Sequence, residues 1–413
     1  MRKRLSVFTK PETRESAVNP FVNLTTTPSF YEKAKLVLMA PVACVRIICG
    51  VGNILSLAAV CKLLTLGLSE KDLKEKPLSK TRYDILSWSI YIFGRSFLFC
   101  LGFHWIEVRG KPATTEEAPI VVCNHTCMID PFILGHMLST SAVGAREHLS
   151  TPILGVIFRA QQLITVDRKD PNSRHDVKKM IKQRAQPGSG WLAQTLIFPE
   201  ATCTNGRALI SFRGGPFAPG APVQPVVVRF PHTHFDPCWV QGGPGMPMIL
   251  YRLACQFHNY ARVDFLTPHV PSSKEKSNPI LYGNNVRQRM SEVMEVPCTW
   301  HGYDDVRLQM EAQKLHLPAS IGVVGMQGIQ EGKFFSITTT VLSFFSYFFF
   351  LFVSICDDIH VLTSSDTELY LSLLCSYFFC FFFRSVWSRH SSKHRVQTYG
   401  EICNNGYQPN WTY

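Results

Sequence analysis

Four long apolar stretches, two near each end of the chain, flank a region of shorter apolar runs. The first, residues 36–68, would form a helix of roughly 50 Å, longer than the ~30 Å hydrocarbon core of a bilayer. It is interrupted by Pro41, Arg46, a Gly-Val-Gly-Asn cluster at 50–53 and Lys62. A bent or re-entrant helical element is therefore expected, rather than a straight span.

The second apolar stretch, residues 85–105, carries one charge, Arg95. The linker between the two stretches and the arm before the first are both basic. Because basic flanks favour the cytosolic side, one simple crossing cannot satisfy both. We expect residues 36–105 to form a hairpin embedded in the cytosolic leaflet, with two true spans as the alternative, and residues 1–35 to form a basic cytosolic arm.

At the other end, an uncharged stretch at 334–356 and a shorter one at 369–383 enclose an acidic loop and have basic outer flanks. This charge pattern predicts a transmembrane hairpin over 334–387, after a linker (318–333) and before a basic polar tail (388–413). The stretches hold 13 of the 29 phenylalanines, which is unusual for membrane helices. A tail from an alternative exon or a misassigned coding region is the other interpretation.

In the central region, residues 106–317, short β-branched runs alternate with helical segments. This alternation predicts an α/β catalytic domain with a mainly parallel central sheet and covering helices. Ligand chemistry in such domains lies beyond the carboxyl ends of the strands. The expected strands are the runs PIVVCN, QLITVD, TLIFPE, PVQPVVVRF and VDFLTP.

The composition limits the classes of binding partner that are expected. The formal net charge of +12 favours phosphate-rich ligands or an anionic membrane. Aromatic and basic residues do not interleave in a patch, so no nucleic-acid partner is expected. The 14 cysteines are scattered without a CxxC pair, which indicates reduced, buried thiols and no zinc site.

Candidate chemistry first appears in the string NHTCMID, where His125 and Asp130 lie five positions apart. On one continuous helix they would be ~140° apart. Asp130 before Pro131 is typical of a helix N-cap, so the chain must turn there. If the side chains meet, Asp130 fixes the tautomer of His125, which can then take a proton from a hydroxyl. A capping aspartate and an ordinary loop histidine are the alternative.

The string FPEATCTN, residues 198–205, follows another expected strand. Glu200 is a candidate for binding a ligand hydroxyl, or is a turn carboxylate. The loop of residues 202–206 offers hydroxyls and backbone donors to an anion. Arg168 is placed to pair with a phosphate, or is a surface charge. Arg207 and Arg213 are weaker candidates for coenzyme phosphates.

Other features limit the chemistry. A GxSxG elbow is absent, and Cys127 and Cys203 are expected only to pack, which favours direct attack by a substrate hydroxyl. The cluster at 232–236 is interpreted as an exposed loop rather than a metal site. The basic segment 174–184 predicts a solvated helix face, with contact to an anionic membrane as the alternative.

These strings resemble the glycerolipid acyltransferase superfamily, marked by its His-x4-Asp motif, here His125 to Asp130. Over about residues 30–330 the chain is similar to the lysophosphatidylcholine acyltransferase family. The resemblance implies acyl transfer from acyl-CoA, a substrate rather than a cofactor, to the free hydroxyl of a lysophospholipid. It also implies the endoplasmic reticulum membrane or lipid droplets, with the catalytic domain facing the cytosol.

The same resemblance implies roles for individual residues. His125 is the general base and Asp130 orients it. Arg168 matches the arginine of the family's second block, which is linked to phosphate binding. Residues 200–203 match the third block, and residues 222–225 match the fourth, which shapes the acyl or acceptor pocket. The expected substrate-binding residues are Asn124, Arg168, Glu200, Thr202, Thr204, Asn205, Pro222, Gln224 and Pro225.

The chain departs from the family pattern twice. Ala201 replaces the glycine of the usual EGTC sequence, and a required positive φ would cost about 1–2 kcal/mol there. Reduced or altered activity is expected. Some relatives carry EF-hands, but a D-x-D-x-D-G loop is absent, so no calcium site is expected.

Two other functions stay open from the sequence. One is the same chemistry on lysophosphatidate or glycerol 3-phosphate, and the other is an inactive membrane protein that binds lipid or acyl-CoA. The acceptor headgroup, the acyl-chain preference and the oligomeric state are not determined by the sequence.

Overall fold

The computed structural model describes residues 19–167, 170 and 173–314. The expected linker at 318–333, the hairpin at 334–387 and the tail at 388–413 lie outside the described residues, and so does Arg168.

A seven-stranded sheet with the order β1-β7-β6-β2-β5-β3-β4 forms the centre of the fold. Neighbouring strands are parallel except β6 and β7. The predicted mainly parallel α/β fold is thus confirmed, although β7 runs against β6 and two further strands, β1 and β3, were not predicted. The strands are β1 (Trp105–Arg109), β2 (Ile120–Cys123), β3 (Ser141–Ala145), β4 (Ile164–Val166), β5 (Thr195–Ile197), β6 (Val223–Arg229) and β7 (Tyr260–Phe265).

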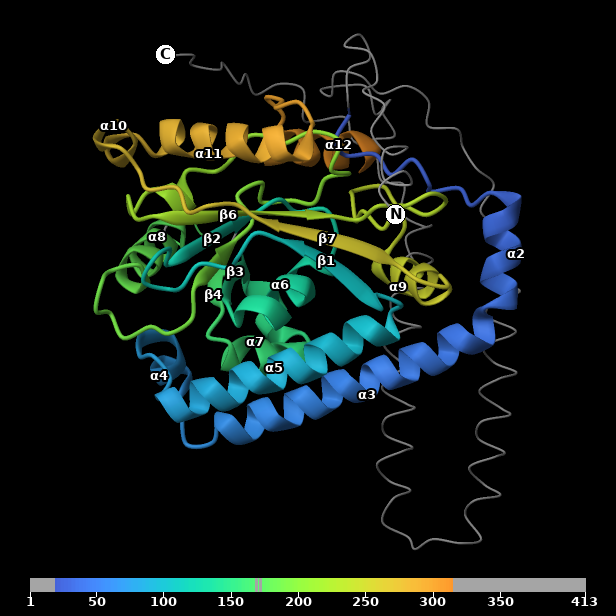
Figure 1. The fold of residues 1–413 in the computed structure, drawn as a ribbon, viewed down its shortest axis with the longest axis horizontal. Coiled ribbons are helices and arrows are strands. Elements are labelled where there is room, and N and C mark those ends of the chain that lie inside the picture. Colours follow the sequence, from blue (N-terminus) through green and yellow to red (C-terminus); the bar gives the residue numbers. More distant parts are fainter. Residues whose placement is uncertain (1–18, 168–169, 171–172, 315–413) are drawn as a thin grey trace, which may run out of the picture. The chain divides into compact units, whose positions relative to one another are not determined.

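Helices cover both faces of the sheet because successive strand residues point to opposite sides. Val121 of β2 packs in a core with α5 (Lys80–Cys100), α6 (Asp130–Leu138) and α9 (Met246–Ala254). Its neighbour Val122 packs in a second core with α8 (Ser173–Arg184) and α11 (Pro279–Met294). Figure 1 shows α11 across the sheet from α5 and α6. Shorter helices are α4 (Glu70–Glu75), α7 (Leu154–Ala160), α10 (Ser273–Ser277) and α12 (Tyr303–Lys314).

The N-terminal hairpin consists of α3 (Ala40–Leu64) and α5, which lie side by side and antiparallel (Figure 1). The expected bend is at Met39, between α2 (Phe30–Leu38) and the proline in the first turn of α3. The helix α3 continues unbroken through the glycine cluster at 50–53. A Cβ at Gly50 would lie 3.4 Å from the ring of Phe97. The small residue therefore permits close contact between α3 and α5.

One side of the hairpin packs against the catalytic domain and the other is apolar and open. Leu57 and Cys61 of α3 pack with Leu86 of α5 and Ile157 of α7. Within the described residues, α3 is the one helix long and apolar enough to cross a membrane by length and composition, and most of its apolar window is not buried. The exposed apolar side chains of the two helices are Val42, Val45, Ile48, Leu63, Ile85, Trp88, Tyr91, Ile92 and Phe99.

Residues 1–35 were expected to form an arm, but the described part of this range is folded. From Asn19 onward the chain packs against the catalytic domain, and α2 begins at Phe30. Glu32 and Lys35 of α2 are buried and form an ion pair of 2.7 Å, and Lys35 also donates to Gln256. Residues 19–35 are therefore part of the folded domain and not of a free arm.

The basic segment at 174–184 forms α8, whose apolar side is used inside the protein. Val177 and Ile181 are buried in the core between the sheet and α11. Arg184 is also buried and donates to the Ser141 hydroxyl and the Gln162 carbonyl. The apolar side of α8 is thus occupied by the sheet, which removes it as a membrane-binding face.

Candidate active site

His125 and Asp130 meet where the chain leaves the carboxyl end of β2. Nδ1 of His125 lies 2.9 Å from Oδ2 of Asp130. The same oxygen accepts the main-chain N–H groups of Thr126 and Cys127 at 2.8 and 2.9 Å. Asp130 is fully buried, whereas the imidazole is 19% exposed. A carboxylate that already accepts two N–H groups makes Nδ1 the donor, which leaves Nε2 of His125 to accept a proton.

The expected turn between the two residues is present, but Asp130 does not cap its helix. The N-cap of α6 is Ile129, which makes no side-chain capping bond, and Asp130 is the first helical residue. Its carboxylate points back along the chain into the turn at 126–127. The capping interpretation was therefore wrong, because the carboxylate serves the loop that carries His125.

The loop after β5 contacts His125 in three ways, through two main-chain hydrogen bonds and one ring stack. Oε1 of Glu200 accepts the main-chain N–H of His125 at 2.9 Å. The N–H of Thr204 donates to the His125 carbonyl at 2.8 Å. The ring of Phe198 stacks on the imidazole, with centroids 4.2 Å apart and planes at 23°. Phe198 received no role from the sequence, although its position at a strand end beside Glu200 was an available signal.

Glu200 is a buried carboxyl group within this loop. Its pKa is raised to about 8, chiefly by burial and also by the nearby Asp130, although the N–H groups of His125 and Ile210 and the Thr204 hydroxyl lower it. At neutral pH the group is therefore largely uncharged. Because its oxygens face partners inside the protein, the geometry gives Glu200 the task of holding His125, not of binding a ligand hydroxyl.

Three amides predicted to bind substrate, Asn124, Asn205 and Gln224, are used by the protein itself. All three are buried, and each donates and accepts within the chain. Their bonds leave no free donor pair for a ligand, so the prediction was wrong for these residues. Asn124 bonds both main-chain groups of Val228 and the Thr126 hydroxyl, Gln224 bonds Lys111, Ala113 and Leu266, and Asn205 bonds Asn19, Val22 and Arg207.

The predicted pocket block, residues 222–225, lies mostly inside the sheet. Pro225 is buried in β6 and is the register partner of Val122. Pro222 precedes β6, at the amino edge of a strand parallel to β2. His125 lies at the carboxyl edge, so the structure does not bring Pro222 or Gln224 to it.

Ala201 adopts φ +59°, in the left-handed region that favours glycine. It is exposed and lies between Glu200, which holds His125, and Thr202, which is half-buried. The conformation expected of the family's glycine is thus present here with an alanine.

The cysteines of the site pack, as expected. Cys127 and Cys203 are buried, and burial raises the pKa of both thiols well above the usual value. Neither thiol is poised to be a nucleophile. The loop at 232–236 was expected to be exposed, but its Phe235 and Asp236 are buried.

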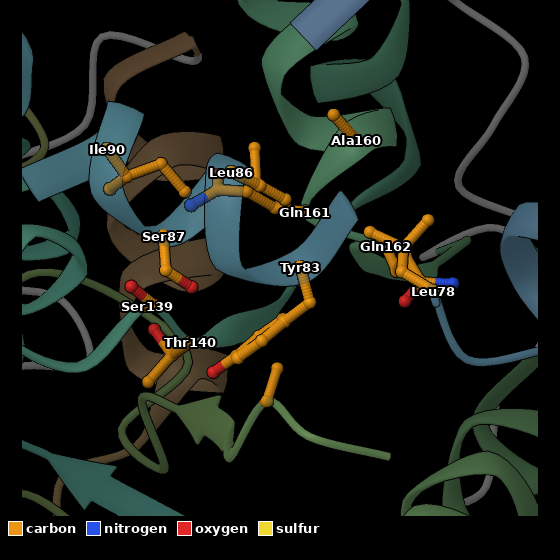
Figure 2. Close-up of a pocket in the computed structure, with 11 residues that line it drawn as sticks. Leu78, Tyr83, Leu86, Ser87, Ile90, Ser139, Thr140, Ala160, Gln161 and Gln162 are labelled. Carbon is orange, nitrogen blue, oxygen red and sulfur yellow. The ribbon is translucent and has the colours of Figure 1, made fainter. Parts of the chain in front are cut away.

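A small cavity lies apart from this site, between α5 and the sheet. Figure 2 shows the hydroxyl-bearing Tyr83 and Ser87 of α5 facing Ser139 and Thr140. None of the residues that contact His125 lines this cavity, so it is separate from the His125 site. It is lined by Leu78, Tyr83, Leu86, Ser87, Ile90, Ser139, Thr140, Ala160, Gln161, Gln162 and Ala193.

Comparison with known proteins matches the residues of the site to one family. The family model described as Acyltransferase matches residues 105–229, which include His125, Asp130 and Glu200. The chain is 37% identical over 314 residues to the lysophospholipid acyltransferase LPEAT2 of Arabidopsis thaliana, covering 76% of this chain and 57% of that protein. It is 36% identical over 304 residues to human lysophosphatidylcholine acyltransferase 1, covering 73% and 56%.

The chain spans little more than half the length of these curated relatives. Among solved structures, it is similar to the 1-acyl-sn-glycerophosphate acyltransferase PlsC of Thermotoga maritima, with a TM-score of 0.44 and 16% identity over 64% of this chain and 96% of that one.

Proposed function

We propose that the chain, whose residues 105–229 match the Acyltransferase family model, transfers an acyl group from acyl-CoA to the free hydroxyl of a lysophospholipid. The bond between His125 and Asp130 is the observation that carries this proposal. It gives one partly exposed imidazole nitrogen that can accept a proton, backed by a buried carboxylate. Relatives named for lysophospholipid acyltransfer support the choice of acceptor.

In the proposed reaction, Nε2 of His125 removes the proton of the acceptor hydroxyl as its oxygen attacks the thioester carbonyl. The new C–O ester bond forms, the C–S bond breaks, and the proton passes from His125 to the coenzyme A thiolate. Asp130 stabilises the imidazolium between these steps. The buried, protonated thiols of Cys127 and Cys203 favour this direct transfer over a cysteinyl intermediate.

Phosphate groups of the substrates need a cationic partner. We assign this role to Arg168 because of the family resemblance. The strand before it, β4, ends at Val166 and runs parallel to β3, β5 and β2, so it ends on the same edge of the sheet as His125. Arg207, which is exposed, is a second candidate.

We also propose that the hairpin holds the enzyme at the endoplasmic reticulum membrane, or on lipid droplets, with the catalytic domain in the cytosol. The exposed apolar side of α3 and α5 and the net charge of +12 support an anionic membrane surface. This arrangement suits a reaction between a membrane lipid and the water-soluble acyl-CoA.

The test is an acyltransfer assay with the purified chain in phospholipid vesicles. Labelled acyl-CoA is offered with lysophosphatidylcholine, lysophosphatidylethanolamine, lysophosphatidate or glycerol 3-phosphate, and His125→Ala is the control. We expect labelled phospholipid from a lysophospholipid with the wild type only. Label in phosphatidate or lysophosphatidate alone would reassign the acceptor, and acyl-CoA binding without any product would indicate a lipid-binding protein.

A further inference from the structure

The segment Asn19–Thr26, here called the strap, precedes α2 and is firmly attached to the catalytic domain. Its Phe21 is 1% exposed and packs with Ile210 and Val306. The ring of Phe21 also meets His301 edge-on, with centroids 5.9 Å apart. Such a buried aromatic ring fixes the path of an otherwise irregular segment.

The strap is bonded to the loop that follows β5. The main-chain N–H of Asn205 donates to the Pro20 carbonyl at 2.8 Å. The side-chain nitrogen of Asn205 donates to the carbonyls of Asn19 and Val22 at 2.9 and 3.0 Å. The preceding residue, Thr204, donates to the His125 carbonyl. One peptide unit therefore separates the strap contact from the contact with His125.

The strap is also bonded to the loop that follows β6. The side-chain nitrogen of Asn23 donates to the carbonyls of Asp236 and Cys238, both at 3.1 Å. The next residue, Trp239, donates its main-chain N–H to the Thr126 carbonyl at 2.9 Å. Here too, one residue separates the strap contact from the turn that carries His125.

We propose that the strap is a positioning element of the acyltransfer site; this rests on the proposed function. The positioning residues are Asn23 of the strap and Asn205, which is bonded to the strap. The carbonyls of His125 and Thr126 are held by two loops without regular secondary structure, and the strap ties both loops from outside. Amides buried against main-chain carbonyls are costly to disrupt, so the bonds constrain where these loops can lie. The strap thereby limits the displacement of His125 relative to the substrates.

The experiment compares Asn205→Asp with Gln162→Glu in the full chain. Asn205→Asp keeps the size and the acceptor for Arg207 but places an oxygen against two carbonyls. Gln162 makes the matching pair of bonds, from its amide nitrogen to the carbonyls of Leu73 and Lys76, and it is equally buried at 8% exposure. It precedes β4, on the edge of the sheet opposite His125.

Two measurements distinguish positioning from stability alone. The first is amide hydrogen exchange of the peptide covering residues 121–128, which needs no activity. The second is kcat, KM and the pH profile with vesicle-borne lysophospholipid. We expect Asn205→Asp to speed exchange in this peptide, lower kcat by about 10- to 100-fold with little change in KM, and shift the rising limb of the pH profile. We expect Gln162→Glu to leave the exchange and the pH profile unchanged at a similar loss of Tm.

Asn23→Asp tests the same proposal through the second loop and carries the test if Asn205→Asp does not fold. Unchanged exchange at 121–128 in the folded strap variants overturns the proposal, as does a fall in kcat no greater than that of Gln162→Glu. An inactive wild-type chain would instead contradict the proposed function, and the exchange data would still decide whether the strap holds His125.

Discussion

The main-chain N–H of His125 donates to Oε1 of Glu200 over 2.9 Å, so the residue with the candidate base is held by a buried carboxyl group. Glu200 has no exposed surface, and its neighbour Asp130 is also fully buried. Two carboxyl groups so close cannot both ionise without cost. Burial and the nearby Asp130 raise the pKa of Glu200, so Glu200 keeps its proton at neutral pH.

The raised pKa of Glu200 predicts a pH-dependent stability. The folded-state pKa is about 8 against an ordinary value of 4.5. The contribution of protonated Glu200 to the free energy of unfolding is therefore complete below pH 4.5 and is lost as pH rises to about 8. The loss is at most about 1.4 kcal/mol for each pH unit. Glu200→Gln removes this titration, and we expect its Tm relative to wild type to rise between pH 5 and pH 9.

Glu275→Gln is the control for this measurement. Burial raises the pKa of Glu275, but hydrogen bonds from Asn285 and Ser272 and the charge of His269 outweigh it and lower the pKa to about 2. Its stabilisation is complete above pH 4.5 and is lost only as pH falls toward 2. Glu275→Gln should therefore lower Tm at both pH 5 and pH 9, and its Tm relative to wild type should rise less between them than that of Glu200→Gln. A parallel shift for both variants would contradict the assignment of Glu200.

Replacement of His125 or Asp130 should lower kcat strongly while the fold persists. His125→Ala removes the base, and we expect kcat to fall by about 10²- to 10⁴-fold. Asp130→Asn keeps the shape but no longer enforces the tautomer, with a loss of similar size. Steady-state assays with labelled acyl-CoA, alongside Tm, measure both. A variant with wild-type kcat would remove that residue from the mechanism.

Ala201→Gly should relieve backbone strain beside the site. A φ of +59° costs an alanine about 1 kcal/mol, so we expect Tm to rise by a few degrees. Because Ala201 adjoins Glu200, the rate or the acceptor preference should also change. The control is Glu295→Gly, at φ +58° after α11, which relieves the same strain away from His125. If both variants gain Tm and neither alters activity, Ala201 has no catalytic consequence.

Charge on the apolar side of the hairpin should weaken membrane binding. Ile48 and Trp88 are 58% and 67% exposed, so Ile48→Glu and Trp88→Glu should leave Tm almost unchanged. Burying a carboxylate in lipid is costly, and we expect at least about tenfold weaker binding in vesicle flotation. Ile280→Glu, at a 70% exposed position of α11 on the other side of the sheet, is the control. Equal flotation of all three variants would place the membrane contact elsewhere.

The α/β class and the edge of the sheet that carries the chemistry were predictable. The β-branched run at 120–123 became β2, and His125 follows it, because buried parallel strands leave a simple apolar signal and their carboxyl ends share one edge. The positive φ at Ala201 was also anticipated, since glycine in a motif signals a backbone conformation and not only a small side chain.

Roles that depend on partners far along the chain could not be predicted in this way. The sequence predicted ligand-binding roles for the amides of Asn124, Asn205 and Gln224. Their hydrogen-bond partners instead include main-chain groups of Val228, Val22 and Leu266. A polar side chain in a motif shows the same letters whether its hydrogen bonds go to a substrate or to buried main chain. Only the fold decides which, because it determines which main-chain groups lie unpaired nearby.

The sequence by itself determined the strand and helix pattern, the pairing of His125 with Asp130 as a hypothesis, and the apolar hairpin, because each is set by residues close together in the chain. The tertiary structure decided what holds that pair in place. Phe198 and Glu200 contact His125 from more than 70 residues away, and the strap, about 100 residues away, acts on it through Asn205, so no local pattern records these relationships.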